Sequence, residues 1–71
     1  MYQFYYVNND RTHNPGLHHE VHTKSHVEQL NIRSKTLLGY FSNEIDAVQA
    51  AKRLFPDADG CAICCPKAHR G

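Results

Sequence analysis

The order of apolar and polar positions along the 71-residue chain predicts three short strands. Residues 2–7 are aromatic and β-branched, which is typical of a strand. Residues 17–23 and 36–41 predict two more. The segment between the first two, residues 8–16, reads as a loop in which Asn14-Pro15-Gly16 favours a type II turn. That loop lets the second strand return antiparallel to the first.

The clearest predicted element is a helix over residues 43–55. Ser42 is suited to its N-cap, because a serine hydroxyl can accept from a free amide of the first turn. Pro56 disfavours helical backbone at Phe55 and so ends the element. Apolar residues recur at helical spacing and give the helix a buried stripe: Ile45, Val48, Ala51, Leu54 and Phe55. Residues 24–34 show weak periodicity that is enough for one helical turn.

These elements predict a small α+β fold and a single domain over residues 1–71. Two or three antiparallel strands would pack against the main helix, and the Cys-rich C-terminal turn would fold back toward the histidines. The expected core joins apolar residues of the strands and the helix: Phe4, Tyr6, Leu37, Phe41, Ile45, Val48, Leu54 and Phe55.

Length and composition indicate that such a core needs additional stabilisation, for example by a cross-link. A chain of this size buries a modest fraction of its surface, and small domains often add a disulfide, a metal or a partner chain. The sequence has no Trp and three Phe. Its formal charge of +1 makes nucleic-acid binding unexpected, because such binders usually carry a clear cationic excess.

The N-terminus lacks the features of a signal peptide, and no run reaches the length of a membrane span. We therefore expect a soluble, cytoplasmic protein.

The cysteines are candidates for this stabilising cross-link, since all three lie within residues 61–65. Tetrahedral zinc takes four thiolate or imidazole ligands, usually as two close pairs. Cys61 and Cys64 form a C-x-x-C pair, with Gly60 easing the turn before it and Pro66 closing it. A reducing compartment favours metal ligation over disulfides for such thiols.

His22 and His26 are the second candidate pair, because an H-x-x-x-H spacing can place both rings on one side of a turn. Cys65 and His69, four residues apart, are alternates that could replace one partner. The spacing leaves open which two thiols ligate. The resulting hypothesis is a structural zinc-binding module with no enzymatic activity.

Two other functional classes fit the residues. A metal-free interaction or accessory domain would use the edge of the aromatic N-terminal strand to meet a protein partner or a second copy in a homodimer. A thiol redox protein would use the C-x-x-C pair, but this pair follows a helix instead of starting one. Asp57 and Asp59 should also raise the pKa of a nearby thiol. No residue set indicates hydrolytic catalysis, so we expect no enzyme.

Several runs of the sequence also carry a resemblance. They are Leu38-Gly39-Tyr40-Phe41-Ser42-Asn43, then Asp46-Ala47-Val48, and Phe55-Pro56-Asp57-Ala58-Asp59-Gly60-Cys61 with Cys64-Cys65 and His69 behind it. This part of the chain resembles a family of small, uncharacterised bacterial Cys/His-rich proteins with a C-x-x-C-C tail and an upstream H-x-x-x-C. The chain departs from that pattern at His26 and Ala68, where the family has cysteine.

That family is in turn distantly similar to the N-terminal zinc domain of the Ada-type DNA-repair protein. There, one pair of ligands precedes a strand and helix, and a C-x-x-C pair follows them. The resemblance implies that the first pair falls on His22 and His26 and the second on Cys61 and Cys64. His22 stands where the Ada domain has its methyl-accepting thiolate, so methyl transfer is not implied.

Overall fold

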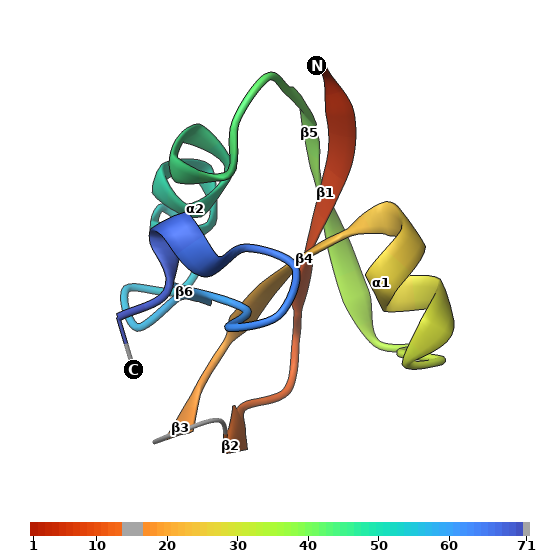
Figure 1. Cartoon of the computed structure of the whole chain (residues 1–71). Coiled ribbons are helices and arrows are strands. Elements are labelled where there is room, and N and C mark those ends of the chain that lie inside the picture. The colour runs from red at the N-terminus through yellow and green to blue at the C-terminus, as the bar shows by residue number, and fades with distance from the viewer. Residues whose placement is uncertain (14–16, 71) are drawn as a thin grey trace.

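The computed structural model describes residues 1–13 and 17–70, so the turn predicted at 14–16 lies outside the described residues. A four-stranded sheet has the order β5-β1-β4-β6, formed by β1 (Gln3–Asn8), β4 (Glu20–Thr23), β5 (Lys35–Phe41) and β6 (Asp59–Gly60). The helices are α1 (Lys24–Gln29), α2 (Glu44–Lys52) and the short 3-10 helix η1 (Pro66–Ala68). Figure 1 shows their arrangement.

The predicted α+β fold is confirmed, and the three predicted strands are present. β1 pairs antiparallel with β4 on one side and β5 on the other. The region expected to be one strand over 17–23 is divided, because β3 (Leu17–His18) leaves the main sheet to pair with β2 (Thr12–His13). The two-residue strand β6 was not predicted, and it pairs parallel to β4. A strand this short has no apolar alternation to reveal it.

The strand β1 presents the opposite face to the core from the one expected. Tyr5 and Val7 are buried and pack with Val21 and the helix α2, whereas Phe4 is 44% exposed. Tyr6 is only half-buried. Alternation along a strand defines two faces but does not say which one a helix covers, and the large aromatic residues favoured the wrong face. Phe4 instead packs against the exposed Tyr40 of β5, with ring centroids 4.7 Å apart.

Small residues of α2 make its contact with the sheet. Ala47, Val48 and Ala51 are the buried residues of this helix, so only Val48 and Ala51 of the predicted stripe are buried. Phe41 and Phe55 are half-buried and pack against the core, as expected. The other three predicted core residues are exposed by half or more: Leu37, Ile45 and Leu54. Alanines let the helix approach the sheet closely, and this rotates the stripe away from Ile45.

The ends of α2 also differ from the prediction. Asn43, not Ser42, is the N-cap, and its Oδ1 accepts from the Asp46 amide at 2.9 Å. Either side chain has the right chemistry, so the sequence alone does not choose between them. The helix ends at Lys52 instead of Phe55, although the amides of Leu54 and Phe55 still donate to the Ala51 carbonyl.

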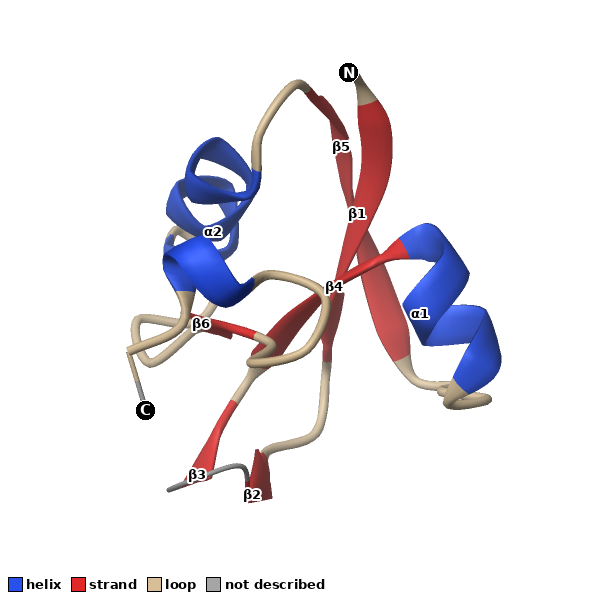
Figure 2. Cartoon of the chain, in the orientation of Figure 1, coloured by secondary structure: helices blue, strands red, loops and turns tan. Residues whose placement is uncertain are grey.

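The ambiguous segment after β4 forms the helix α1, which is capped by Thr23. The strands β1 and β5 lie between α2 and α1 (Figure 2). Because β4 runs directly into α1, the polypeptide turns sharply at Thr23. This turn and the return of the C-terminal segment along β4 position the candidate site.

Candidate metal centre

The two candidate histidines meet because a strand passes into a helix between them. His22 lies in β4 and His26 lies in α1. The Thr23 hydroxyl accepts from the His26 amide at 3.3 Å, which fixes the first turn of the helix. The imidazole rings are then 5.4 Å apart between centroids. The predicted H-x-x-x-H pair is therefore brought together by a strand-to-helix turn capped at Thr23.

The cysteine turn reaches the histidines through the parallel pairing of β6 with β4. In this register Val21 lies beside Gly60, and the Cys61 amide donates to the Val21 carbonyl at 3.0 Å. The Cys65 amide then donates to the Cys61 carbonyl at 2.8 Å and closes the turn. Cys61 and Cys64 are thereby carried to the end of β4, where His22 lies.

His22, His26, Cys61 and Cys64 lie close enough to coordinate one metal ion. One ligand atom from each residue lies within 4.8 Å of the others. An ideal tetrahedral zinc site separates its sulfur atoms by about 3.8 Å and its nitrogen atoms by about 3.3 Å, given the usual bond lengths. The widest pair therefore has to close by on the order of 1 Å to match that geometry. Rotation of side chains can supply such a change without moving the strands.

The two ring nitrogens of each histidine have different surroundings. His22 Nδ1 lies 3.7 Å from Cys64 Sγ, while its Nε2 lies 3.8 Å from the Glu20 carboxylate. His26 Nδ1 lies 3.3 Å from the Gln29 side-chain oxygen. Its Nε2 is buried and has no hydrogen-bond partner among the described residues. A buried imidazole nitrogen without a partner is costly, and a metal ion at the cluster would satisfy it.

Hydrogen bonds also distinguish the three thiols, which are all free. The Cys65 thiol lies 3.8 Å from Cys64 Sγ, and its hydrogen bond lowers the pKa of Cys64, with further contributions from His22 and the Thr23 amide. The neighbouring Cys64 sulfur in turn raises the pKa of Cys65. Burial raises the pKa of Cys61, although the amides of Cys64 and Ile63 donate to its sulfur and oppose that shift. The hydrogen bonds thus favour the thiolate form at Cys64 over that at Cys65.

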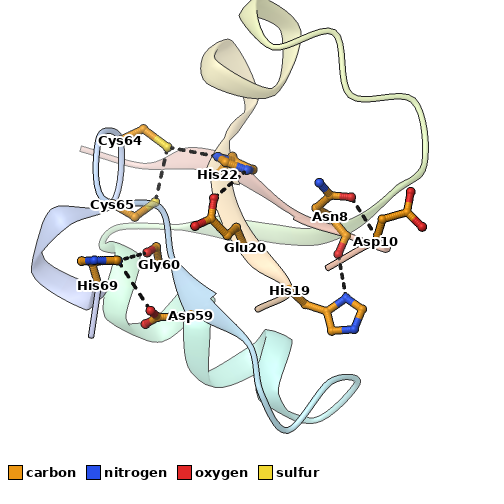
Figure 3. A network of polar contacts seen from close by, with 10 residues as sticks. All are labelled: Asn8, Asp10, His19, Glu20, His22, Asp59, Gly60, Cys64, Cys65 and His69. Atoms are coloured by element: carbon orange, nitrogen blue, oxygen red, sulfur yellow. Dashed lines mark hydrogen bonds and ion pairs between the residues drawn. The ribbon is translucent and has the colours of Figure 1, made fainter. Parts of the chain in front are cut away.

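The alternate ligands Cys65 and His69 have other surroundings (Figure 3). Cys65 is fully buried and belongs to the core beneath α2. His69 Nδ1 lies 2.9 Å from the Gly60 carbonyl and 3.5 Å from the Asp59 carboxylate. Among the described residues, neither belongs to the group that could hold a metal ion. The geometry therefore favours Cys61 and Cys64 as the thiol pair that the spacing left open.

The acidic residues before the turn do not act on Cys64 as expected. Asp57 pairs with Arg11 at 3.0 Å, and the Asp59 carboxylate accepts from the Arg70 amide at 2.9 Å. The pKa of Cys64 is lowered, not raised, because sulfur-directed hydrogen bonds outweigh its burial. Contacts at the sulfur atom, which the sequence does not show, decide its ionisation.

Sequence reasoning missed one residue of the site, Glu20. Its side chain is 5% exposed, and burial raises the pKa of its carboxyl group. The signal was present in the strand: residues 20 and 22 are two apart, so their side chains lie on the same face. Ligating histidines commonly donate their second ring N–H to such a carboxylate, which fixes the ring and its tautomer.

Comparison with protein-family models, with curated proteins and with solved structures finds no match to this chain. Across the described residues, the helices are too short or too polar to span a bilayer.

Proposed function

We propose that the protein is a structural zinc-binding module in which one ion joins the C-terminal cysteine turn to β4 and α1. The observation that carries the proposal is the convergence of His22, His26, Cys61 and Cys64, with ligand atoms within 4.8 Å of one another. The two pairs come from parts of the chain that are more than thirty residues apart. The buried His26 Nε2, which has no hydrogen-bond partner among the described residues, also supports the proposal.

The donor set favours zinc. Two thiolates and two imidazoles form one of the common structural zinc sites, whereas calcium and magnesium prefer oxygen ligands. Two thiolates also neutralise the charge of a divalent ion, which suits a partly buried site. Four protein ligands fill a tetrahedral shell and leave no position for a reactive water. This supports a structural role without catalysis, and reduced thiols fit the reducing cytoplasm.

The fold explains why a bound ion would stabilise this protein. The core consists mainly of valines, alanines and a cysteine, together with Tyr5, and such small side chains contribute little burial energy each. The C-terminal turn is tied to β4 through the two-residue strand β6. A metal ion that binds only the folded chain adds its binding free energy to folding. We infer that it holds this turn in place.

The deciding experiment is elemental analysis of protein purified without a histidine tag, combined with thermal melts with and without a strong chelator. One equivalent of zinc and a large fall in Tm on chelation are expected. His69→Gln is the matched control, since His69 lies on Asp59 and Gly60 and should retain zinc. Metal-free protein with an unchanged melt would overturn the proposal.

A thiol redox role is the second candidate, because the pKa of Cys64 is lowered. Cys61 and Cys64 would form a disulfide, passing two electrons and two protons to a disulfide of a partner. This role predicts metal-free protein whose two thiols oxidise reversibly. In the interaction-domain alternative, the edge would be limited to the start of β1, because Tyr5, Tyr6 and Val7 pair with both β4 and β5.

A further inference from the structure

Two adjoining cavities lie between α2, β6 and the last residues of the chain. Figure 1 shows α2, β6 and the C-terminal helical turn side by side. The first cavity has a volume of about 100 Å³ and the second about 260 Å³. Lys52, Asp59 and Arg70 line both. We call the two together the α2 groove.

The first cavity carries an excess of positive charge. Lys52, Lys67 and Arg70 line it and come from three segments. Among the described residues, none of these three side chains has an acidic partner within ion-pair distance. Asp59 is the one acid of this lining. Its carboxylate accepts from the Arg70 amide at 2.9 and 3.1 Å and lies near His69. Three formal positive charges against one negative leave an excess of two.

The rest of the first cavity is apolar, with one amide. Ile45, Val48 and Ala68 provide carbon surface, and Gln49 supplies a side chain that can donate and accept. Val48 is 5% exposed and anchors this surface in the core. A wall of low polarity next to the cations strengthens their attraction for an anion, because water screens it less.

We propose that the α2 groove binds a small phosphorylated molecule, with its phosphate group in the first cavity. A phosphate monoester carries a charge of about −1.5 to −2 at neutral pH, which matches the excess of two. The guanidinium of Arg70 can bind two phosphate oxygens at once, and lysines add point charges. A cavity of about 100 Å³ accepts one such group.

The second cavity has the character of a site for the organic part. Pro56 and Ala58 provide apolar contact, and the carboxylates of Asp57 and Asp59 can accept from hydroxyl groups. His18 also lines it. The expected class is therefore a phosphorylated hydroxy compound.

The test is an NMR titration of isotopically labelled protein, as purified, in phosphate-free buffer at constant ionic strength. Inorganic phosphate and glycerol phosphate are the probes, with sodium chloride as the reference. Saturable shifts are expected at the amides of Lys52, Lys67 and Arg70, and tighter binding of glycerol phosphate. Equal, non-saturating shifts with chloride would overturn the proposal.

Variants separate the groove from general charge effects. Arg70→Gln and Lys52→Gln should each weaken binding by about tenfold, the usual size of one lost charge-assisted hydrogen bond. Lys24→Gln is the matched control, because Lys24 lies in α1 and pairs with Glu28 at 2.9 Å. Its affinity should equal that of the native chain, and an equal loss in all three would refute a defined site. Binding of an oligonucleotide without saturation by either phosphate would assign the groove to an extended polyanion instead. Unchanged melts would show that the substitutions leave the fold intact.

Discussion

The Nδ1 atom of His22 lies 3.7 Å from the Sγ atom of Cys64, although the two residues are 42 positions apart in the chain. This contact joins the second strand of the antiparallel pair to the C-terminal turn. It exists because β6 pairs parallel to β4 and delivers the turn to the end of that strand. A single ion placed between these atoms would therefore act on two distant parts of the fold together.

The three cysteines should respond differently to substitution. Cys61→Ser and Cys64→Ser are expected to abolish tight zinc binding and to cost about 3 kcal/mol of stability or more, because structural zinc in small fingers binds with on the order of 10 kcal/mol. Cys65→Ala should keep its zinc and lose about 1 kcal/mol, the effect of removing one small buried group. Elemental analysis and denaturant unfolding measure both quantities. Loss of zinc from Cys65→Ala with retention in Cys64→Ser would show that the thiol pair is wrongly assigned.

Glu20 should tune the affinity of the site. Glu20→Gln is expected to weaken zinc binding by about 10- to 100-fold, the usual effect of removing a carboxylate behind a ligating histidine. Competition with a chromophoric chelator measures this. Glu28→Gln is the control, since Glu28 is exposed and pairs with Lys24. Equal affinities for both variants would remove Glu20 from the site.

The sign of the Glu20 pKa shift predicts a second difference. Burial raises the pKa of this carboxyl group, so folding of the metal-free chain disfavours its charged form. Its stabilising effect is present at acidic pH and is lost as the pH rises through the folded-state pKa. At neutral pH the uncharged glutamine should therefore leave the metal-free protein at least as stable as the native chain. Affinity and stability would then move in opposite directions, which simple damage to the fold would not produce.

Ligand chemistry was more predictable from the sequence than the packing that surrounds it. His22, His26, Cys61 and Cys64 could be selected because metal ligands need particular side chains in close pairs, and the structure brings these four together. The choice among the thiols depended on which sulfur atoms lie beside the histidines, and tertiary contacts determine that. The sequence likewise gave no indication of the strand β6, which brings the cysteine pair to the histidine pair.

The residues of the core were less predictable from the sequence than the metal ligands. The sequence indicated the main strands and the helix, but the predicted core included Phe4 and omitted Tyr5, whereas Phe4 is exposed and Tyr5 is buried. Both faces of β1 carry aromatic residues, so alternation alone did not decide. The helix α2 determines which face of β1 is buried, because its alanines pack with Tyr5 and Val7.

The N-cap of α2 offers a direct test of a boundary that the sequence left ambiguous. Asn43→Ala should cost about 1 kcal/mol, because the Asp46 amide loses its acceptor. Ser42→Ala should change stability by less than about 0.5 kcal/mol, as for an ordinary surface substitution. Denaturant unfolding of the zinc-loaded proteins measures the difference. A larger loss of stability from Ser42→Ala than from Asn43→Ala would show that Ser42 is the N-cap.

Gly60 should prove indispensable to the cysteine turn because of the space around its Cα atom. A methyl group there would lie 2.8 Å from the Cys65 carbonyl oxygen and 2.9 Å from the Ala68 carbonyl carbon. Both are backbone atoms, so relief requires the turn or η1 to move. Gly60→Ala is therefore expected to destabilise the protein by about 1–3 kcal/mol. It should also weaken zinc binding, since the same movement carries Cys61 and Cys64 away from the histidines. Native stability and zinc affinity in this variant would mean that the turn tolerates displacement, and that the parallel pairing of β6 is not what positions the thiols.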